Sequence, residues 1–242
     1  MLFVDRSNHQ IKKVHNGRVY TVAGSGVHGC TGDHGPAVDA CLHRPGGVAT
    51  DQAGNLYTND YGNNVIRKID TKGMISTVAG NGNYGYEGDH GQAGMAALNK
   101  PYGLCVAPDG SRLYIADYGN HCIREVNLRT GTIETLCGTG IPGYSGDDGL
   151  CSLAQLNGPF WVTLYKNELF IADANNHAIR KIDLSTKIIT TAVGDGTPGY
   201  VDVAYDLKHV KLNIPAGIAI NDQYIFIADY GKNVVRKVRY AT

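Results

Sequence analysis

Apolar residues along the chain fall in short runs separated by glycine, asparagine and aspartate. The clearest stretch is 102–138, where four runs are joined by the sequences "DGSR", "YGN" and "RTG". Short β-branched and aromatic runs are typical of strands, and Asp-Gly and Asn-rich links are typical of tight turns. The pattern predicts a four-stranded antiparallel meander with strands A to D at 102–108, 113–117, 122–128 and 132–138. A further strand A is expected at 160–164.

The same pattern recurs about every 56 residues, in the segments "VDRSNHQIKKV", "NDYGNNVIRKI", "ADYGNHCIREV", "ADANNHAIRKI" and "ADYGKNVVRKV". A fixed period of this size indicates a repeat architecture. One small sheet cannot bury both faces alone, whereas sheets stacked around an axis can, so we predict an all-β propeller of four-stranded antiparallel blades. A linear solenoid usually has shorter repeats. No long amphipathic helix is expected, only a short helical turn near 93–98.

The elements "NHCIREV", "NHAIRKI" and "NNVIRKI", followed by a "GYxGDxG" loop and an "LNxPxG" segment, resemble NHL repeats. The resemblance covers essentially the whole chain, with repeat signatures near 2–14, 56–69, 113–126, 169–182 and 226–238. It implies one β-propeller domain over 1–242, of a family in which six blades are frequent. Propellers of this kind mostly bind proteins or nucleic acids, and a few are enzymes.

The repeats at the two ends of the sequence are incomplete. The first lacks a strand A and the last lacks a strand D, which gives three four-stranded and two three-stranded blades, eighteen strands in all. We expect five blades with exposed strand edges at the seam, a feature that favours pairing with another chain. The prediction is that a partner covers this seam, possible homo-oligomerisation included, or that the gene product is longer.

Two charged positions recur once per blade. An Asp-x-x-Asn turn follows strand B, and a basic residue lies seven positions after its aspartate in strand C. A guanidinium can pair with a carboxylate of its own or an adjacent blade. We therefore expect these residues to maintain blade geometry rather than to catalyse. They are Asp60, Asp117, Asp173 and Asp229 with Arg67, Arg124, Arg180 and Arg236, and Asp5 with Lys12 in the first repeat.

The long D–A connections at 24–45, 80–101, 138–159 and 194–215 are predicted to share one face with the Asp-x-x-Asn turns, because connections in a meander alternate between faces. Loops carry function more often than the scaffold does, so any binding is expected there. We expect the loop aspartates to cap backbone amides and the tyrosines, including Tyr200, to pack on their own blade. The candidate binding residues are Asp33, His34, Tyr86, Asp89, His90, Tyr144, Asp147 and Asp148.

Metal and cofactor binding are not predicted. The Asp-His pairs suit zinc or calcium by residue type, but equivalent loops on sheets packed about 10 Å apart would have to converge on one ion. The six cysteines include no Cys-x-x-Cys pair, and Cys105, Cys122 and Cys137 fall in apolar runs typical of small buried hydrophobes. A reducing compartment such as the cytoplasm is favoured.

The charge balance bears on the class of partner. Lys+Arg and Asp+Glu both number 22, so the net charge is zero, which argues against an electrostatic nucleic-acid binder. No apolar run approaches the length of a membrane span, and no signal peptide is visible. A protein is therefore the favoured partner class.

The leading functional prediction is a non-catalytic scaffold or binding module, because nearly every distinctive polar residue recurs once per blade, whereas catalysis needs a unique constellation. The alternative is a metal-assisted lyase or hydrolase of the six-bladed NHL-like kind. Its candidates, His43, Asp148 and His209, are scattered, and Trp161 is expected in the core or lining a channel. A fragment of a larger protein is a third possibility.

Overall fold

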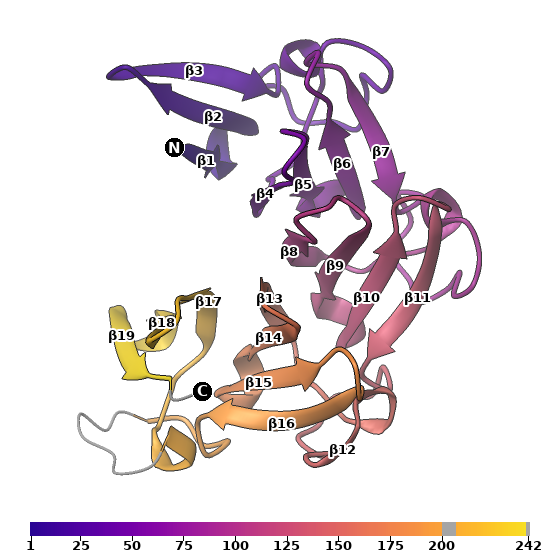
Figure 1. Cartoon of the computed structure of the whole chain (residues 1–242). Helices are drawn as coiled ribbons and strands as arrows, with labels where there is room; N and C mark the ends of the chain where they lie inside the picture. The colour runs from indigo at the N-terminus through magenta and orange to yellow at the C-terminus, as the bar shows by residue number, and fades with distance from the viewer. Residues whose placement is uncertain (200–206, 241–242) are drawn as a thin grey trace. The chain divides into compact units, whose positions relative to one another are not determined.

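The computed structural model describes residues 1–199 and 207–240, in which nineteen strands form five antiparallel sheets (Figure 1). The first sheet contains β1 (Leu2–Asp5), β2 (Gln10–His15) and β3 (Arg18–Ala23), and the second contains β4 (Val48–Thr50), β5 (Leu56–Asp60), β6 (Val65–Ile69) and β7 (Ile75–Ala79). The third contains β8 (Pro101–Val106), β9 (Arg112–Asp117), β10 (Cys122–Asn127) and β11 (Thr132–Cys137). The fourth contains β12 (Gly149–Leu150), β13 (Pro159–Tyr165), β14 (Glu168–Asp173), β15 (Ala178–Asp183) and β16 (Ile188–Val193). The fifth contains β17 (Pro215–Ile220), β18 (Tyr224–Asp229) and β19 (Val234–Arg239).

These sheets confirm the predicted all-β propeller fold, with blades of three to five strands. Eighteen of the strands are those predicted from the pattern, and the first and last sheets have three each. The additional strand is β12, which pairs with β16. The helical turn expected near 93–98 is the 3₁₀ turn η4 (Ala93–Met95).

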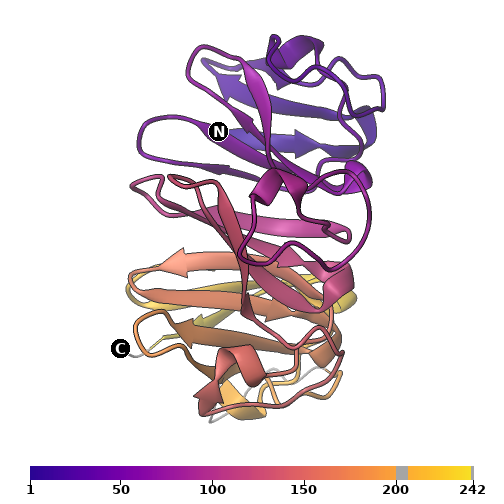
Figure 2. The same cartoon turned by 90° about the vertical axis from the view of Figure 1, so that its right-hand side faces the viewer.

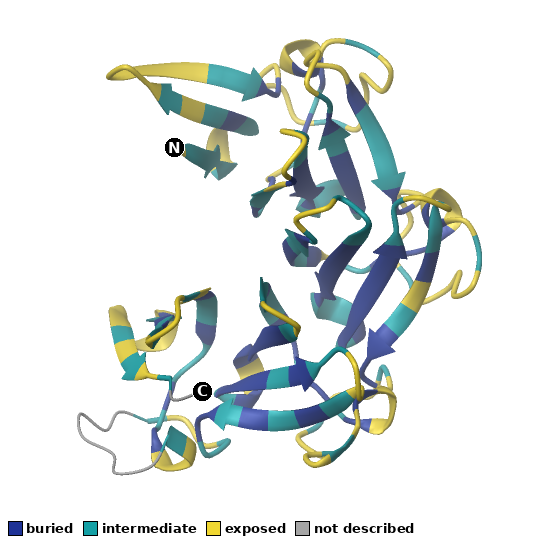
Figure 3. Ribbon diagram, viewed as in Figure 1, coloured by how far each residue is buried: buried dark blue, intermediate teal, exposed yellow. Residues whose placement is uncertain are grey.

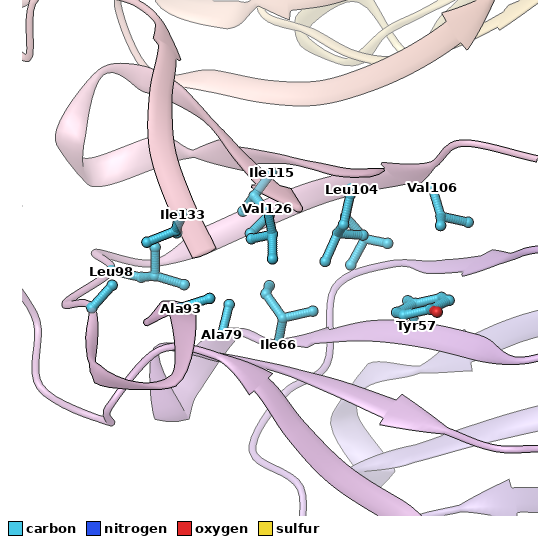
Figure 4. Close-up of a cluster of buried hydrophobic side chains, with 12 residues drawn as sticks. Tyr57, Ile66, Ala79, Ala93, Leu98, Leu104, Val106, Ile115, Val126 and Ile133 are labelled. Atoms are coloured by element: carbon cyan, nitrogen blue, oxygen red, sulfur yellow. The ribbon is translucent and has the colours of Figure 1, made fainter. Parts of the chain in front are cut away.

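The chain divides into two compact units, one of residues 1–115 with 125–134 and the other of residues 116–124 with 135–242. A single domain over 1–242 stays a prediction. In the first unit, a cluster of buried apolar side chains lies between the second and third sheets, with Ile66 and Leu104 facing each other across it (Figure 4). The middle strands of the chain are largely buried, whereas β3 and β19 carry exposed residues (Figure 3). Burial of alternate apolar positions on such short strands supplies the main stabilisation.

A β-bulge stands in strand C immediately before its basic residue. The register between strands C and D shifts between Ile66 and Arg67 in the second sheet and between Ile179 and Arg180 in the fourth. The first sheet has the same shift between Ile11 and Lys12. A bulge bends the strand and re-aims a side chain, so its position directs the arginine toward the loops.

Each of the first three D–A loops pairs with strand D of the following sheet. His34 donates its amide N–H to the carbonyl of Ile75 at 2.8 Å, and His90 donates to Ile133 at 2.7 Å. Asp148 donates in the same way to Ile189 at 2.8 Å. Figure 2 shows the long connection between β7 and β8 (purple) passing over the outer strands of the third sheet. The loops therefore fasten consecutive blades.

Candidate functional site

The recurring aspartates at the end of strand B are fully buried acceptors in every blade except the first, where Asp5 is partly exposed. Asp173 accepts the amide N–H of Asn157 and the side-chain N–H of Asn176, both at 2.7 Å. Arg180 Nη1 lies 3.5 Å from its second oxygen. Burial raises the pKa of Asp173 to about 7, and these donors act in the opposite direction. The aspartate thereby joins strand B to the start of the blade.

Asp60 makes the same contacts in the second blade, with the amide of His43 at 2.6 Å and Asn63 Nδ2 at 2.8 Å. Arg67 Nη1 lies 3.5 Å away, and burial raises the pKa of Asp60. Asp229 accepts from the amide of Asn213 at 2.7 Å and from Arg236 Nε at 2.8 Å. The Asp117–Arg124 pair, at 3.6 Å, is also fully buried. This geometry supports a structural role for the repeated pair.

The loop aspartates have a different partner from the one expected. Asp33 accepts from Arg67 Nη2 at 2.8 Å, and Asp147 accepts from Nη2 and Nε of Arg180 at 2.7 and 3.1 Å. The prediction that these two carboxylates cap backbone amides is therefore wrong, because the bulged strand directs the guanidinium toward the loop. Each arginine links its own strand-B aspartate with a loop aspartate.

The residue after each loop aspartate contacts the next blade through its backbone amide. His34, His90 and Asp148 have φ of 63°, 65° and 63°, in the left-handed region that Asn, Asp and His tolerate better than most residues. Their amides hold strand D of the following blade, as described above. Their side chains are exposed, and His90 Nδ1 lies 3.9 Å from Glu134 Oε2.

The loop tyrosines differ in exposure. Tyr144 packs under Arg180, with the guanidinium carbon 5.0 Å from the ring centroid, and its hydroxyl lies 3.0 Å from Thr191 Oγ1. Tyr144 thus contacts the blade that follows its loop. Tyr86 is 42% exposed. Tyr200 lies outside the described residues.

The histidine of the recurring Asn-His element anchors the next blade. Nδ1 of His121 accepts the amide N–H of Gly158 at 3.0 Å, and Nδ1 of His177 accepts that of Ile214 at 3.2 Å. Asn64 replaces this histidine in the second repeat, and its Oδ1 accepts the amide of Lys100 at 2.9 Å. Burial lowers the pKa of His121 and of His177, which favours the neutral, accepting form.

A cavity on the loop side of the second blade is a candidate binding site. Its volume is about 450 Å³, and it lies between the turn after β5 and the connection from β7 to β8. Tyr84, one lining residue, is 80% exposed. Tyr61 stands in an aromatic cluster: its ring centroid is 5.4 Å from that of Tyr102, and the Arg6 guanidinium lies 5.0 Å from both rings. The lining residues are Tyr61, Gly62, Asn64, Tyr84, Asn99 and Lys100.

None of these lining residues was among the predicted site residues. Tyr84 departs from the repeat, because the equivalent loop positions hold His28, Pro142 and Pro198. That departure is a signal that the sequence offered. The prediction concentrated on recurring residues, which the structure commits to ion pairs and backbone contacts.

Three histidines gather beside this cavity. The ring centroids of His9, His28 and His43 lie 5.7 to 6.0 Å apart. His43 adjoins the cavity, since its carbonyl accepts the amide N–H of Gly62 at 2.8 Å. Burial, His28, His43 and Arg44 lower the pKa of His9, whose Nδ1 accepts the Arg44 amide at 3.0 Å. Its Nε2 therefore carries the proton in the neutral ring.

The other two pattern-breaking candidates belong to other elements: Asp148 to the third D–A loop, and His209 to the 3₁₀ turn η8 (Leu207–His209). Within 1–199 and 207–240, no three or more His, Cys, Asp or Glu side chains are placed to hold a metal ion. In the same part of the chain, no helix has the length and apolar character needed to span a bilayer. Trp161 is partly buried and lines an apolar cavity of about 300 Å³ with residues of the fifth sheet.

Family models match two parts of the chain. The Teneurin NHL domain matches residues 22–85, and the NHL repeat matches residues 98–125. Protein SUPPRESSOR OF QUENCHING 1, chloroplastic, of Arabidopsis thaliana is 27% identical over 98% of this chain and 29% of its own length. NHL repeat-containing protein 2 of Gallus gallus is 42% identical over 41% of this chain and 13% of its own length. The chain therefore spans less than a third of either relative.

Solved structures share the fold. An auxiliary nutrient binding protein from Bacteroides ovatus superposes with a TM-score of 0.64 at 23% identity, over 84% of this chain and 50% of that one. A chain of a nidogen/laminin complex gives 0.65 at 16% identity, over 98% and 70%. Virginiamycin B lyase from Staphylococcus aureus gives 0.56 at 16% identity, over 100% and 66%.

The Asp–Arg framework, the Asn-His anchor, the five sheets and the two family matches agree with one another. This chain carries NHL-repeat sequences at residues 22–85 and 98–125 and has the β-propeller fold.

Proposed function

We propose that this chain is a non-catalytic binding module that takes a peptide segment of a protein partner in the cavity of the second blade. The observation that carries the proposal is the cavity itself, since it combines an exposed tyrosine ring, asparagine side chains and a lysine on the loop side. Exposed aromatic residues are frequent anchors in protein interfaces.

The charge of the cavity favours an acidic segment. Lys100 is the one lining residue that carries a charge at neutral pH, and it is positive. The guanidinium of Arg6 lies against the ring of Tyr61. No Asp or Glu is among the lining residues. An acidic side chain can therefore approach Lys100 while an apolar neighbour packs on Tyr84.

The repeated charged residues offer little for chemistry. Asp60, Asp173, Arg67 and Arg180 are fully buried and engaged with one another or with loop aspartates. The fold neighbours include an auxiliary nutrient binding protein and a chain of a nidogen/laminin complex, which agrees with binding as a use of this architecture.

A displayed random-peptide library, selected on the immobilised full chain, tests this proposal. We expect enriched acidic peptides whose affinity falls about tenfold or more for Tyr84→Ala and for Lys100→Glu. Lys72→Glu, in the exposed turn between β6 and β7, is the matched control and should leave affinity unchanged. Peptides that bind the Tyr84→Ala/Lys100→Glu double variant as tightly as the unaltered protein would contradict the proposal.

One observation favours a lyase or hydrolase as the second candidate. The group of His9, His28 and His43 is not repeated in the other blades, and it adjoins the same cavity through Gly62. A neutral imidazole is a general base. Turnover of a peptide or ester library that is lost in His43→Ala, with peptide binding retained, would establish this alternative.

A further inference from the structure

Two cysteines, one from a strand and one from a 3₁₀ turn, lie together at the base of the third D–A loop. Cys137 is the last residue of β11, and Cys151 begins the 3₁₀ turn η6 (Cys151–Leu153). Their exposures are 0% and 1%. The Cys151 thiol donates to the carbonyl of Leu136, the residue before Cys137, at 3.1 Å. Gly138, the residue after Cys137, donates its amide N–H to the Cys151 carbonyl at 3.0 Å.

The other repeats show that this pair is not required by the fold. The equivalent positions are Ala79 with Ala93 in the next loop toward the N-terminus, and Ala23 with Ala37 in the first loop. In all three loops the glycine after strand D donates to the second residue of the pair, with Gly138 to Cys151 at 3.0 Å and Gly80 to Ala93 at 2.9 Å. The backbone therefore brings the two side chains together in each loop, and only the third loop places thiols there.

We propose that Cys137 and Cys151 are a redox-active dithiol that a small peroxide closes into a disulfide. A disulfide joins residues whose Cα atoms lie about 4.4–6.8 Å apart, and the hydrogen bonds of Cys151 to both neighbours of Cys137 hold the two residues side by side. The bond would close a ring around residues 138–150, the loop that carries Tyr144, Asp147 and Asp148. It would covalently fix that loop to the third sheet.

The surroundings set the order of events. The hydrogen bond from Cys137 and the Lys187 ammonium lower the pKa of Cys151, whereas burial raises that of Cys137. The thiolate is the nucleophile, so Cys151 attacks first. Leu150 and Leu153, which flank it, are 49% and 71% exposed, so a local opening of this short turn admits a small oxidant.

The chemistry balances in two steps. The Cys151 thiolate attacks one oxygen of hydrogen peroxide and breaks the O–O bond, which gives the sulfenic acid and hydroxide. The Cys137 sulfur then displaces the sulfenic oxygen, forms the S–S bond and releases water. In sum, two thiols and one peroxide give one disulfide and two water molecules.

The test treats the folded full chain with hydrogen peroxide and then blocks the remaining thiols. Of the six cysteines, two should be lost to labelling, and peptide mass spectrometry should find one linked pair that joins Cys137 and Cys151. Dithiothreitol should restore both thiols. Chymotryptic cleavage after Tyr144 should slow about tenfold in the oxidised protein, because closing the ring restricts the loop.

The double variant Cys137→Ala/Cys151→Ala is the matched control, since it reproduces Ala79 and Ala93. It should fold, keep its four thiols under peroxide, and show no change in cleavage rate. The inference is overturned if the folded protein keeps all six thiols, if Cys151 stops at the sulfenic or sulfinic acid, or if the bond joins another pair, such as Cys30 with Cys41.

Discussion

Replacing Arg180 with methionine tests whether the repeated Asp–Arg pair holds the blades. Arg180 and Asp173 are both fully buried, and Arg180 also binds Asp147 and the carbonyls of Ser145 and Gln155. Methionine keeps most of the aliphatic volume but removes every donor. Asp173 would retain the amide of Asn157 and the side chain of Asn176 as donors.

The expected loss is about 3–5 kcal/mol of unfolding free energy, the usual result of leaving one member of a buried pair without its partner. Because two other donors remain on Asp173, we expect the lower part of that range. For a chain of this size, the loss corresponds to a fall in Tm of roughly 6–20 °C. Asp147→Asn is the matched control; that carboxylate is 37% exposed, so its loss should cost about 1 kcal/mol or less.

The cost should also depend on pH. Burial raises the pKa of Asp173 from 3.8 to about 7. The folded protein therefore binds more protons than the unfolded chain between these values, so this contribution to stability is present below about pH 4 and is lost as the pH rises through 7. Arg180 opposes the shift, so its removal extends the loss to higher pH, and Arg180→Met should be costlier at pH 8 than at pH 5.

Urea unfolding followed by far-ultraviolet circular dichroism, at pH 5 and pH 8, measures both effects. A loss below 1 kcal/mol at pH 8 would refute the structural role of the pair. An equal loss at the two pH values would refute the assignment of the buried charge to Asp173.

Two further predictions use comparisons within the chain. Gly32 has a φ of +100°, and an added Cβ would lie 2.7 Å from the Cα and Cβ of Ala40. Gly73 has a φ of +79° but open space around it. Gly32→Ala should therefore lower the unfolding free energy more than Gly73→Ala does, by about 1 kcal/mol or more. A smaller loss for Gly32→Ala in thermal melts would contradict the packing. His177→Asn should preserve the hydrogen bond to Ile214, as Asn64 does for Lys100, whereas His177→Ala should cost about 1 kcal/mol. Burial lowers the pKa of His177, so the unfolded chain binds more protons than the folded protein below about pH 6.5, and the protein loses stability there. In urea titrations at pH 5, the unfolding free energy of His177→Asn should therefore rise relative to that of the unaltered protein. An unchanged difference between the two proteins would contradict the neutral, buried state of His177.

The repeat period and the turn residues were sufficient to predict the strands of each blade. Strand β11, predicted at 132–138, is Thr132–Cys137, and the turn after β9 contains the expected Asp117 and Asn120. These elements depend on local rules: alternation in short apolar runs, and Asp or Asn where the backbone turns. The strand β12 was missed, since two residues carry no periodicity.

The candidate site could not be found by the same rules. The recurring Asp33 and Asp147 suggested binding residues, but their partners Arg67 and Arg180 lie more than thirty positions away along the chain. The β-bulge that directs these arginines toward the loops is not marked by a particular residue type in the sequence. Cys137 was expected to pack as a small hydrophobe, and its neighbour Cys151 became evident only from the fold.

The sequence by itself determined what repeats: five sheets, one aspartate and one basic residue for each, and loops on the side of the Asp-x-x-Asn turns. A repeated pattern reports local geometry because each blade satisfies the same backbone requirements. The tertiary structure decided what is unique, namely the cavity beside Tyr84, the three histidines and the paired thiols. The cavity and the histidine group draw side chains from separate loops, and the two thiols close the base of one loop. Their proximity is set by how those loops fold back onto the sheets.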